Sequence, residues 1–195
     1  MDERLTAYLE ELHRRGSAHD AEKADRLERL RNLEPDTARL LAVLVRATGA
    51  RRVLELGTSN GYSTIWLADA ARSVGGRVLS VDLDATRIAE ASEHLARVHL
   101  EDIVELRIED AARTLAGSED ASWEMIFLDA ERPAYRGYWP DLLRVLAPGG
   151  LLVVDNVLSH AGELEQFRDL VSSQPGVSGA VVPTGAGALL VVRDF

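Results

Sequence analysis

The fold is decided by one stretch of the sequence, Val53-Leu-Glu-Leu-Gly-Thr-Ser-Asn-Gly-Tyr-Ser-Thr64. A short apolar run that contains Glu55 opens into two glycines, Gly57 and Gly61, and then into the helical pattern of residues 65–69. Strand, glycine turn and helix in this order form the place where open α/β sheets bind small ligands.

The same stretch limits the kind of ligand. Glycine lets the backbone approach a ligand closely, and the helix that follows offers free N–H groups. The spacing differs from the G-x-G-x-x-G of dinucleotide-binding proteins, and no G-K-[ST] follows to form a phosphate loop. An acid in the strand fits poorly with a phosphate, so Glu55 indicates a ligand with a positive charge or hydroxyl groups. A βα turn that needs glycine only for its own geometry is the alternative.

Composition narrows the class of protein. The 195 residues suffice for one domain with a substantial core, and 46% hydrophobic residues with 28% charged residues is ordinary for a soluble globular protein. A formal net charge of −10 argues against a nucleic-acid partner, because it would repel phosphates. The absence of cysteine excludes disulfides, thiolate zinc sites and cysteine nucleophiles. With neither a signal peptide nor an apolar run of membrane-spanning length, we expect a cytoplasmic protein without a membrane partner.

From residue 53 onward the pattern alternates between strand and helix. Strands are predicted at 53–56, 77–81, 103–108, 125–128 and 151–154, and helices at 62–71, 85–100, 135–146 and 162–172. Apolar strands separated by helices predict a parallel sheet covered on both faces. Residues 177–182 and 188–192, joined by a turn with glycines, add an antiparallel hairpin. The prediction is therefore an α/β fold with a seven-stranded, mostly parallel sheet.

The N-terminal region reads as helical and heavily charged. Apolar residues recur at helical spacing in two segments, namely Leu5, Tyr8, Leu9 and Leu12, and then Ala24, Leu27 and Leu30. A third helix begins at Pro35 and ends at Gly49. We predict a single domain over 1–195, with a helical cap at 1–48 and an α/β core at 51–195. The charged helices could cap the active site or pair two subunits as a homodimer.

Every predicted parallel strand delivers a carboxylate at or near its C-terminal edge, where sheets of this kind bind ligands. Besides Glu55 in the first strand, these acids are Asp82, Asp110, Asp129 and Asp155. One such acid alone would be read as a helix cap. Five together predict that this edge binds a positively charged ligand, a ligand with several hydroxyls, or a metal ion.

S-adenosylmethionine has an ammonium, a sulfonium and a ribose diol. Asp82 lies one strand from the glycine turn, where an acid binds ribose hydroxyls in related folds, and Asp110 with Ala111 would then flank the adenine. Asp129 remains for the amino group or a metal. Asp155 and Asn156 add oxygen ligands to form a set suited to Mg²⁺. Taken alone, that last pair is equally well explained by a turn.

Together these residues resemble the cation-dependent O-methyltransferases of the catechol and caffeoyl-CoA type. The resemblance runs from about Leu40 to the C-terminus, and it is specific because several weak motifs occur in one order. These motifs are Leu54-Glu-Leu-Gly-Thr-Ser-Asn-Gly-Tyr-Ser63, Val81-Asp82, Glu109-Asp110-Ala111, Phe127-Leu-Asp129-Ala, Tyr135-x-x-Tyr138 and Gly149-Gly-Leu-Leu-Val-Val-Asp155-Asn-Val-Leu158.

The resemblance implies the Rossmann-like methyltransferase fold, with helices on both faces of the sheet, and S-adenosylmethionine as methyl donor. It implies a divalent cation, expected to be Mg²⁺, on Asp129, Asp155 and Asn156. It also places a set of residues around the cofactor, namely Glu55, Gly57, Thr58, Ser59, Gly61, Ser63, Asp82, Leu83, Asp110, Ala111 and Asp129.

Two features depart from the family pattern. The family usually has a lysine three residues after the first metal-binding Asp, which takes the acceptor's proton, and this chain has Arg132 there. Arginine stays protonated, but it can hold a phenolate electrostatically while the metal lowers the pKa of the hydroxyl. The extended loop that walls the family's acceptor site is short here, at residues 157–162. His160 in this loop is a candidate base.

We therefore expect an O-methyltransferase that acts on a small hydroxylated aromatic acceptor with adjacent hydroxyls. Arg132 and the short loop keep open a metal-independent methyltransferase that acts on another nucleophile. A catalytically silent module that binds S-adenosylmethionine is the non-enzyme alternative. A nucleotide-dependent oxidoreductase is disfavoured by the glycine spacing.

Overall fold

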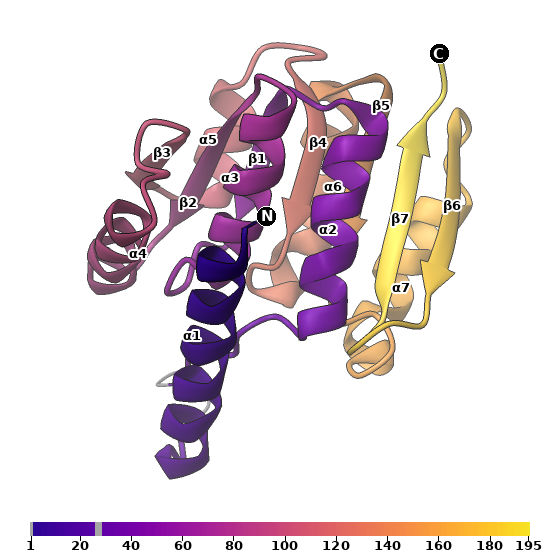
Figure 1. Ribbon diagram of the computed structural model, residues 1–195. Coiled ribbons are helices and arrows are strands. Elements are labelled where there is room, and N and C mark those ends of the chain that lie inside the picture. The colour runs from indigo at the N-terminus through magenta and orange to yellow at the C-terminus, as the bar shows by residue number, and fades with distance from the viewer. Residues whose placement is uncertain (1, 26–28) are drawn as a thin grey trace.

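The computed structural model describes residues 2–25 and 29–195, and it contains a seven-stranded sheet between two layers of helices (Figure 1). The strand order is β3-β2-β1-β4-β5-β7-β6, in which only the β5–β7 and β7–β6 pairs are antiparallel. The strands are β1 (Arg52–Leu56), β2 (Arg77–Asp82), β3 (Val104–Ile108), β4 (Trp123–Leu128), β5 (Leu146–Val154), β6 (Val177–Val182) and β7 (Ala188–Arg193). The predicted fold class is confirmed.

The register of the parallel strands brings their C-terminal ends to one edge of the sheet. Leu56 at the end of β1 is paired with Val81 on one side and with Leu128 on the other. Leu128 is in turn paired with Val154 at the end of β5. The residues that follow these positions therefore lie side by side, and they include the predicted strand-end acids.

Helices cover both faces of the sheet. One face carries α1 (Glu3–Glu22), α2 (Pro35–Thr48), α3 (Tyr62–Ser73) and α4 (Ala85–Arg97), and the other carries α5 (Ala111–Gly117), α6 (Tyr135–Val145) and α7 (Ala161–Ser172). The short 3₁₀ turn η2 (Arg132–Ala134) precedes α6. The central strands are buried on both faces, which is why they read as continuous apolar runs.

Helix α1 packs against α3 and α4 with its first half and extends beyond them with its second half. Leu5, Leu9 and Leu12 are buried in the core. In Figure 1, the indigo helix then runs past the edge at which β4 ends. The second half of α1 is thereby placed next to the C-terminal ends of the strands.

One predicted helix is absent from the described residues, and one observed helix was not predicted. Ala24 and Leu30 do not lie in a second N-terminal helix, while Leu27 lies outside the described residues. Residues 29–34 instead form an irregular segment whose backbone is bonded by side chains from distant parts of the chain. Helix α5 was not predicted, because its seven residues are too few to show a helical period.

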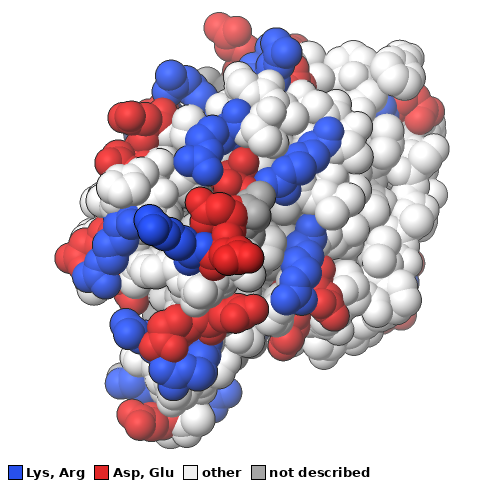
Figure 2. Space-filling view, viewed as in Figure 1, with Lys and Arg blue, Asp and Glu red and all other residues white. Residues whose placement is uncertain are grey.

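The surface carries acidic and basic groups side by side. Figure 2 shows them interspersed on the face that carries α2 and α3, with a largely uncharged area over β6 and β7. Many of them are ion pairs within a helix, such as Arg14–Glu11 and Arg39–Asp36. In the part of the chain that the structure describes, no helix combines the length and the apolarity that crossing a membrane requires.

Candidate active site

A cavity of about 790 Å³ lies at the C-terminal edge of the parallel strands. Its walls include most of the predicted site residues, namely Gly57, Thr58, Ser59, Ser63, Asp82, Leu83, Asp110, Ala111, Asp129, Arg132, Asp155, Asn156 and His160. Glu55 and Gly61 lie behind its wall. A second hollow of about 670 Å³, between α7 and β6, contains none of the strand-end acids. The first cavity is therefore the candidate site.

The two glycines of the turn serve close packing of the backbone. Gly57 has φ +108°, and a Cβ added there would lie 2.2 Å from the carbonyl oxygen of Asp129. Gly61 has φ +84° and forms the N-cap of α3, where a Cβ would lie 2.9 Å from that of Ala91. Both positions need glycine because they combine left-handed backbone with contact to neighbouring chain. The turn is thereby held tightly against β4 and α4.

Glu55 lies beneath this turn rather than on the cavity wall. The side chain is fully buried, and its carboxylate accepts hydrogen bonds of 2.5 Å from the hydroxyls of Ser63, Thr64 and Ser80. Burial raises the pKa of Glu55 to about 7, although the three hydroxyl donors lower it. The carboxylate thus ties β1 to the first turn of α3 and to β2, which fixes the loop that borders the cavity.

Replacing Glu55 with alanine should destabilise the protein by about 3 kcal/mol, because three buried hydroxyls would lose their acceptor. Because the folded pKa of Glu55 lies above the unfolded value, its carboxyl group stabilises the fold at low pH. That contribution is lost as the pH rises from about 4.5 to about 7. Glu55→Gln should therefore reduce the fall in stability over this range. Urea denaturation at pH 5 and pH 8 checks this, and an unchanged pH dependence in Glu55→Gln would contradict it.

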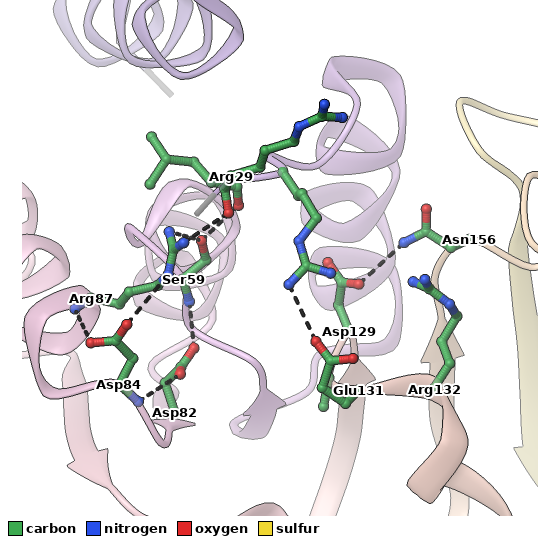
Figure 3. Close-up of polar contacts among 12 residues, drawn as sticks. Arg29, Ser59, Asp82, Asp84, Arg87, Asp129, Glu131, Arg132 and Asn156 are labelled. Carbon is green, nitrogen blue, oxygen red and sulfur yellow. Dashed lines mark hydrogen bonds and ion pairs between the residues drawn. The ribbon is translucent and has the colours of Figure 1, made fainter. Parts of the chain in front are cut away.

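Two further strand-end acids, one at the end of β2 and one after β3, organise the backbone beside the cavity, and Figure 3 shows the first of them, Asp82. Asp82 accepts hydrogen bonds from the backbone N–H of Ser59 at 2.9 Å and of Asp84 at 3.0 Å. Asp110 is the N-cap of α5 and accepts from the N–H of Ala112 at 2.8 Å. Leu83, beside Asp82, leaves 69% of its surface exposed on the cavity wall. Carboxylates and an apolar side chain therefore face the same space.

Asp129, Asp155 and Asn156 meet in one cluster at the ends of β4 and β5. The Asn156 amide donates to Asp129 Oδ1 at 3.2 Å and to Asp155 Oδ2 at 2.9 Å. Asn156 has φ +67°, a left-handed conformation that Asn tolerates better than most residues. Asp155 Oδ1 is buried and has no hydrogen-bond partner among the described residues. The backbone thus converges three side chains on one point and leaves one acid oxygen unsatisfied.

The electrostatics of this cluster favour a cation. Burial raises the pKa of Asp129 to about 6. Burial and the nearby charge of Asp129 raise the pKa of Asp155 to about 8. Two buried acids that resist ionisation, of which Asp155 keeps an oxygen without a hydrogen-bond partner among the described residues, would be stabilised by a bound positive ion. The oxygen-rich donor set fits a hard divalent cation.

Arg132 and His160 lie on the cavity wall near this cluster. Arg132 has only 5% of its side chain exposed, and its Nε donates to Glu163 in the first turn of α7 at 2.8 Å. The ring Nδ1 of His160 lies 2.9 Å from the hydroxyl of Ser159. Figure 3 shows Arg132 beside Asn156 and Asp129. Arg132 is thus a buried side chain that an ion pair holds in place.

Comparison with known proteins identifies the family. The model of the O-methyltransferase family matches residues 3–191. The chain belongs to this family. A catechol O-methyltransferase from Niastella koreensis is 34% identical over 152 residues, which cover 76% of this chain and 66% of that protein, just under two thirds of its length. A catechol O-methyltransferase from Mycobacterium tuberculosis is 31% identical over 157 residues, which cover 75% of this chain and 71% of that protein.

Solved structures of O-methyltransferases share the fold over nearly the whole chain. The O-methyltransferase from Bacillus cereus in complex with S-adenosylhomocysteine has a TM-score of 0.81 at 27% identity and covers 96% of this chain and 91% of its own. The O-methyltransferase TomG from Streptomyces achromogenes, solved with S-adenosylmethionine, has a TM-score of 0.78 at 26% identity and covers 100% of this chain and 91% of its own.

The N-terminal part of this O-methyltransferase contributes wall residues that the sequence did not reveal. His13, Ser17 and Asp20 of α1 line the cavity, as does the whole segment 29–34. No motif in the sequence singled out these residues. The only available signal was that charged residues of α1 continue beyond its buried apolar positions, which did not distinguish a cavity wall from a solvated face.

Proposed function

We propose that this protein transfers a methyl group from S-adenosylmethionine to a hydroxyl of a small aromatic acceptor with adjacent hydroxyls, aided by a divalent cation. The observation that carries the proposal is the converging cluster of Asp129, Asp155 and Asn156, with its unsatisfied buried oxygen, in the cavity that Asp82 also lines. The family match, the names of the catechol O-methyltransferase relatives and the cofactor-bound neighbours support it.

The cofactor would lie along the cavity from β1 to β3. Asp82 is suited to the ribose hydroxyls, because a carboxylate accepts two hydrogen bonds at once. Leu83 and Ala111 offer apolar surface to the adenine, with Asp110 at its edge. The loop with Thr58, Ser59 and Ser63 would border the methionine part, with Asp129 near the amino group. Glu55 would support this loop from beneath.

The cation would be held by Asp129, Asp155 and Asn156. The Asn156 amide now points its N–H groups at both carboxylates, so rotation of the amide would present its oxygen to the ion instead. When bound, a divalent cation supplies Lewis-acid polarisation of the acceptor hydroxyl. The two acids would then ionise fully, because the ion compensates their buried charges.

Transfer would proceed by attack of the acceptor oxygen on the methyl carbon as the bond from this carbon to sulfur breaks, with the hydroxyl proton passing to solvent because Arg132 cannot accept it. The cavity contributes mainly by holding both partners in line and by excluding water. Arg132, fixed by Glu163, would place a permanent positive charge next to the oxygen that loses its proton.

Arg132→Ala should reduce kcat on the order of 10²-fold, because one electrostatic donor to a developing oxyanion is lost. Arg132→Lys should keep substantial activity, since an ammonium still stabilises an anion, and near a dication its pKa can fall far enough for it to act as a base. Steady-state kinetics of both variants check this. If Arg132→Ala matches the wild type, Arg132 does not face the acceptor, and His160 becomes the first candidate for the base.

The proposed function is tested by assaying methyl transfer to a panel of catechols with Mg²⁺ and with excess chelator. We expect S-adenosylhomocysteine and a mono-O-methylated product only with the metal. Full turnover in chelator would favour the metal-independent alternative. Binding of S-adenosylhomocysteine without turnover on any acceptor would favour the catalytically silent module.

A further inference from the structure

We propose that Arg31 selects acceptors that carry an anionic group, such as a carboxylate on the side chain of a catechol. The inference rests on the proposed function and adds the charge class of the substrate. It concerns a residue outside every sequence motif, in the irregular segment between α1 and α2 that lines the cavity.

The backbone around Arg31 is fixed by three side chains. Both carboxylate oxygens of Asp20, in the last turn of α1, accept hydrogen bonds from this backbone, one from the N–H of Leu30 at 2.6 Å and one from that of Arg31 at 2.8 Å. The hydroxyl of Ser59 donates to the carbonyl of Leu30 at 2.8 Å, and Arg87 donates to the carbonyl of Arg29 at 2.8 Å. These last two contacts, drawn in Figure 3, anchor the segment to the glycine turn between β1 and α3 and to α4.

The backbone conformation of Arg31 is itself costly. Its φ is +52°, in the left-handed region that a non-glycine residue adopts only when its surroundings impose it. The Asp20 carboxylate and the two carbonyl contacts impose it here. The chain therefore uses several interactions to hold one arginine in a fixed position on the cavity wall.

The guanidinium of Arg31 lies close to the chain that follows Asp129. It lies 3.4 Å from Glu131, which follows Asp129 by two residues, and Figure 3 marks this ion pair with a dashed line from Glu131. Arg31 and Arg132 line the same cavity as Asp129. Both arginines therefore act on the same part of the cavity.

The two arginines differ in how they are engaged. Arg132 is 5% exposed and forms a 2.8 Å ion pair. The Arg31 pair is longer, and its partners are 42% and 57% exposed, so the pair contributes little to stability. A carboxylate on a bound acceptor could take two parallel hydrogen bonds from such a guanidinium, which is the geometry that arginine favours. Arg31 is thus positioned to bind the carboxylate of the acceptor, and Arg132 is positioned to act at the reacting oxygen.

The acids around the cavity explain why the positive charge of Arg31 would affect substrate binding. Glu34 and Glu131 line the same cavity as Arg31, so both glutamates add negative charge to its wall. The metal ion would compensate Asp129 and Asp155 but not these two glutamates, so they would repel an anionic acceptor unless Arg31 compensates them. Removing Arg31 should therefore penalise anionic acceptors selectively and favour cationic ones.

Three catechols test this charge preference. They share the catechol ring and differ in the charge of a side chain that is separated from the ring by saturated carbon. They are 3,4-dihydroxyphenylacetate, the neutral 3,4-dihydroxyphenylethanol and the cationic dopamine. With Mg²⁺, we expect the wild-type kcat/KM to be about tenfold higher for the anion than for the alcohol and lowest for dopamine. Arg31→Gln should lower kcat/KM for the anion about tenfold, change kcat/KM for the alcohol by no more than about twofold, and raise kcat/KM for dopamine. Arg31→Lys should keep part of the preference for the anion, because lysine keeps the positive charge.

The matched control is Arg107→Gln, because Arg107 on β3 is similarly exposed, at 46%, and is ion-paired with Glu105 outside the cavity wall. Its selectivity should equal that of the wild type. Circular dichroism verifies that each variant is folded. A wild type without charge preference, or an Arg31→Gln variant that loses all three substrates equally, overturns the inference.

A second measurement separates this inference from the proposed function. Calorimetry records binding of the acid and the alcohol to protein saturated with S-adenosylhomocysteine and Mg²⁺, without any turnover. If no acceptor is methylated but the acid binds about tenfold tighter and Arg31→Gln abolishes the difference, the proposed reaction fails and the charge selection stands. Equal binding of the two compounds overturns the charge selection, even if both are methylated.

Discussion

Asp155→Ala should reduce kcat/KM for methyl transfer to a catechol on the order of 10³-fold, because the several kcal/mol that a bound cation contributes would be lost. Asp155 brings to the cluster the buried oxygen that lacks a hydrogen-bond partner. Its loss therefore removes a ligand that the protein cannot replace from nearby side chains. The measurement is a rate of S-adenosylhomocysteine formation at saturating Mg²⁺.

The stability of a second variant, Asp155→Asn, shows whether Asp155 serves function or folding. Its pKa is raised to about 8 in the folded protein, so the protonated form stabilises the fold and this contribution is lost as the pH rises from about 4 toward 8. At pH 8 without metal, Asp155→Asn should be at least as stable as the wild type. Asp120→Ala, at an acid that is 78% exposed and remote from the cavity, is the control and should keep full activity. Full activity of Asp155→Ala would remove the cation from the mechanism.

Asp82→Ala should weaken the binding of S-adenosylhomocysteine about 10²-fold. Two hydrogen bonds from ribose hydroxyls to a carboxylate contribute roughly 3 kcal/mol, which corresponds to this factor. Asp82→Asn should fall between the variant and the wild type, because its amide oxygen can keep one of the contacts. Calorimetric titration measures both affinities.

The interpretation of Asp82→Ala needs one control, because this acid also accepts from the N–H groups of Ser59 and Asp84. Thermal unfolding without ligand should show a loss of stability that Asp82→Asn largely avoids. If the affinity of Asp82→Ala for S-adenosylhomocysteine equals that of the wild type, the ribose does not bind at this acid.

The meeting of the acids could be predicted from the sequence because the strands are continuous apolar runs. Such runs must be buried on both faces in a parallel sheet, and their shared register then brings the residues after Leu56, Val81, Leu128 and Val154 to one edge. The cluster of Asp129 with Asp155 follows from this register alone. The orphaned oxygen of Asp155 does not, since it depends on how the Asn156 amide turns.

The environment of Glu55 could not be predicted from its own stretch. Strand alternation places the Glu55 side chain on the other face of the sheet from Leu54 and Leu56. The three hydroxyls that donate hydrogen bonds to it come from α3 and β2. Only the pairing of Glu55 with Ser80 across β1 and β2 reveals the third of them. Similarly, the glycine at position 57 was expected to admit a ligand, whereas its missing side chain admits the carbonyl of Asp129.

The segment that carries Arg31 shows where sequence patterns fail. Ala24 and Leu30 have helical spacing, yet the conformation at 29–31 is set by Asp20, Ser59 and Arg87. Tertiary contacts over such separations override local propensity, and no periodicity reports them. For this reason the sequence did not reveal that Arg31 lines the cavity.

The central claim is that Asp129, Asp155 and Asn156 hold a divalent cation to which the acceptor comes. Electron paramagnetic resonance with Mn²⁺ in place of Mg²⁺ tests it most directly, because the spectrum reports both binding and changes around the ion. We predict one bound Mn²⁺ per chain in the wild type and none in Asp155→Ala. We also predict a change in the spectrum when a catechol is added together with S-adenosylhomocysteine. A wild type that binds no Mn²⁺, or a bound spectrum that the catechol leaves unchanged, would contradict the claim.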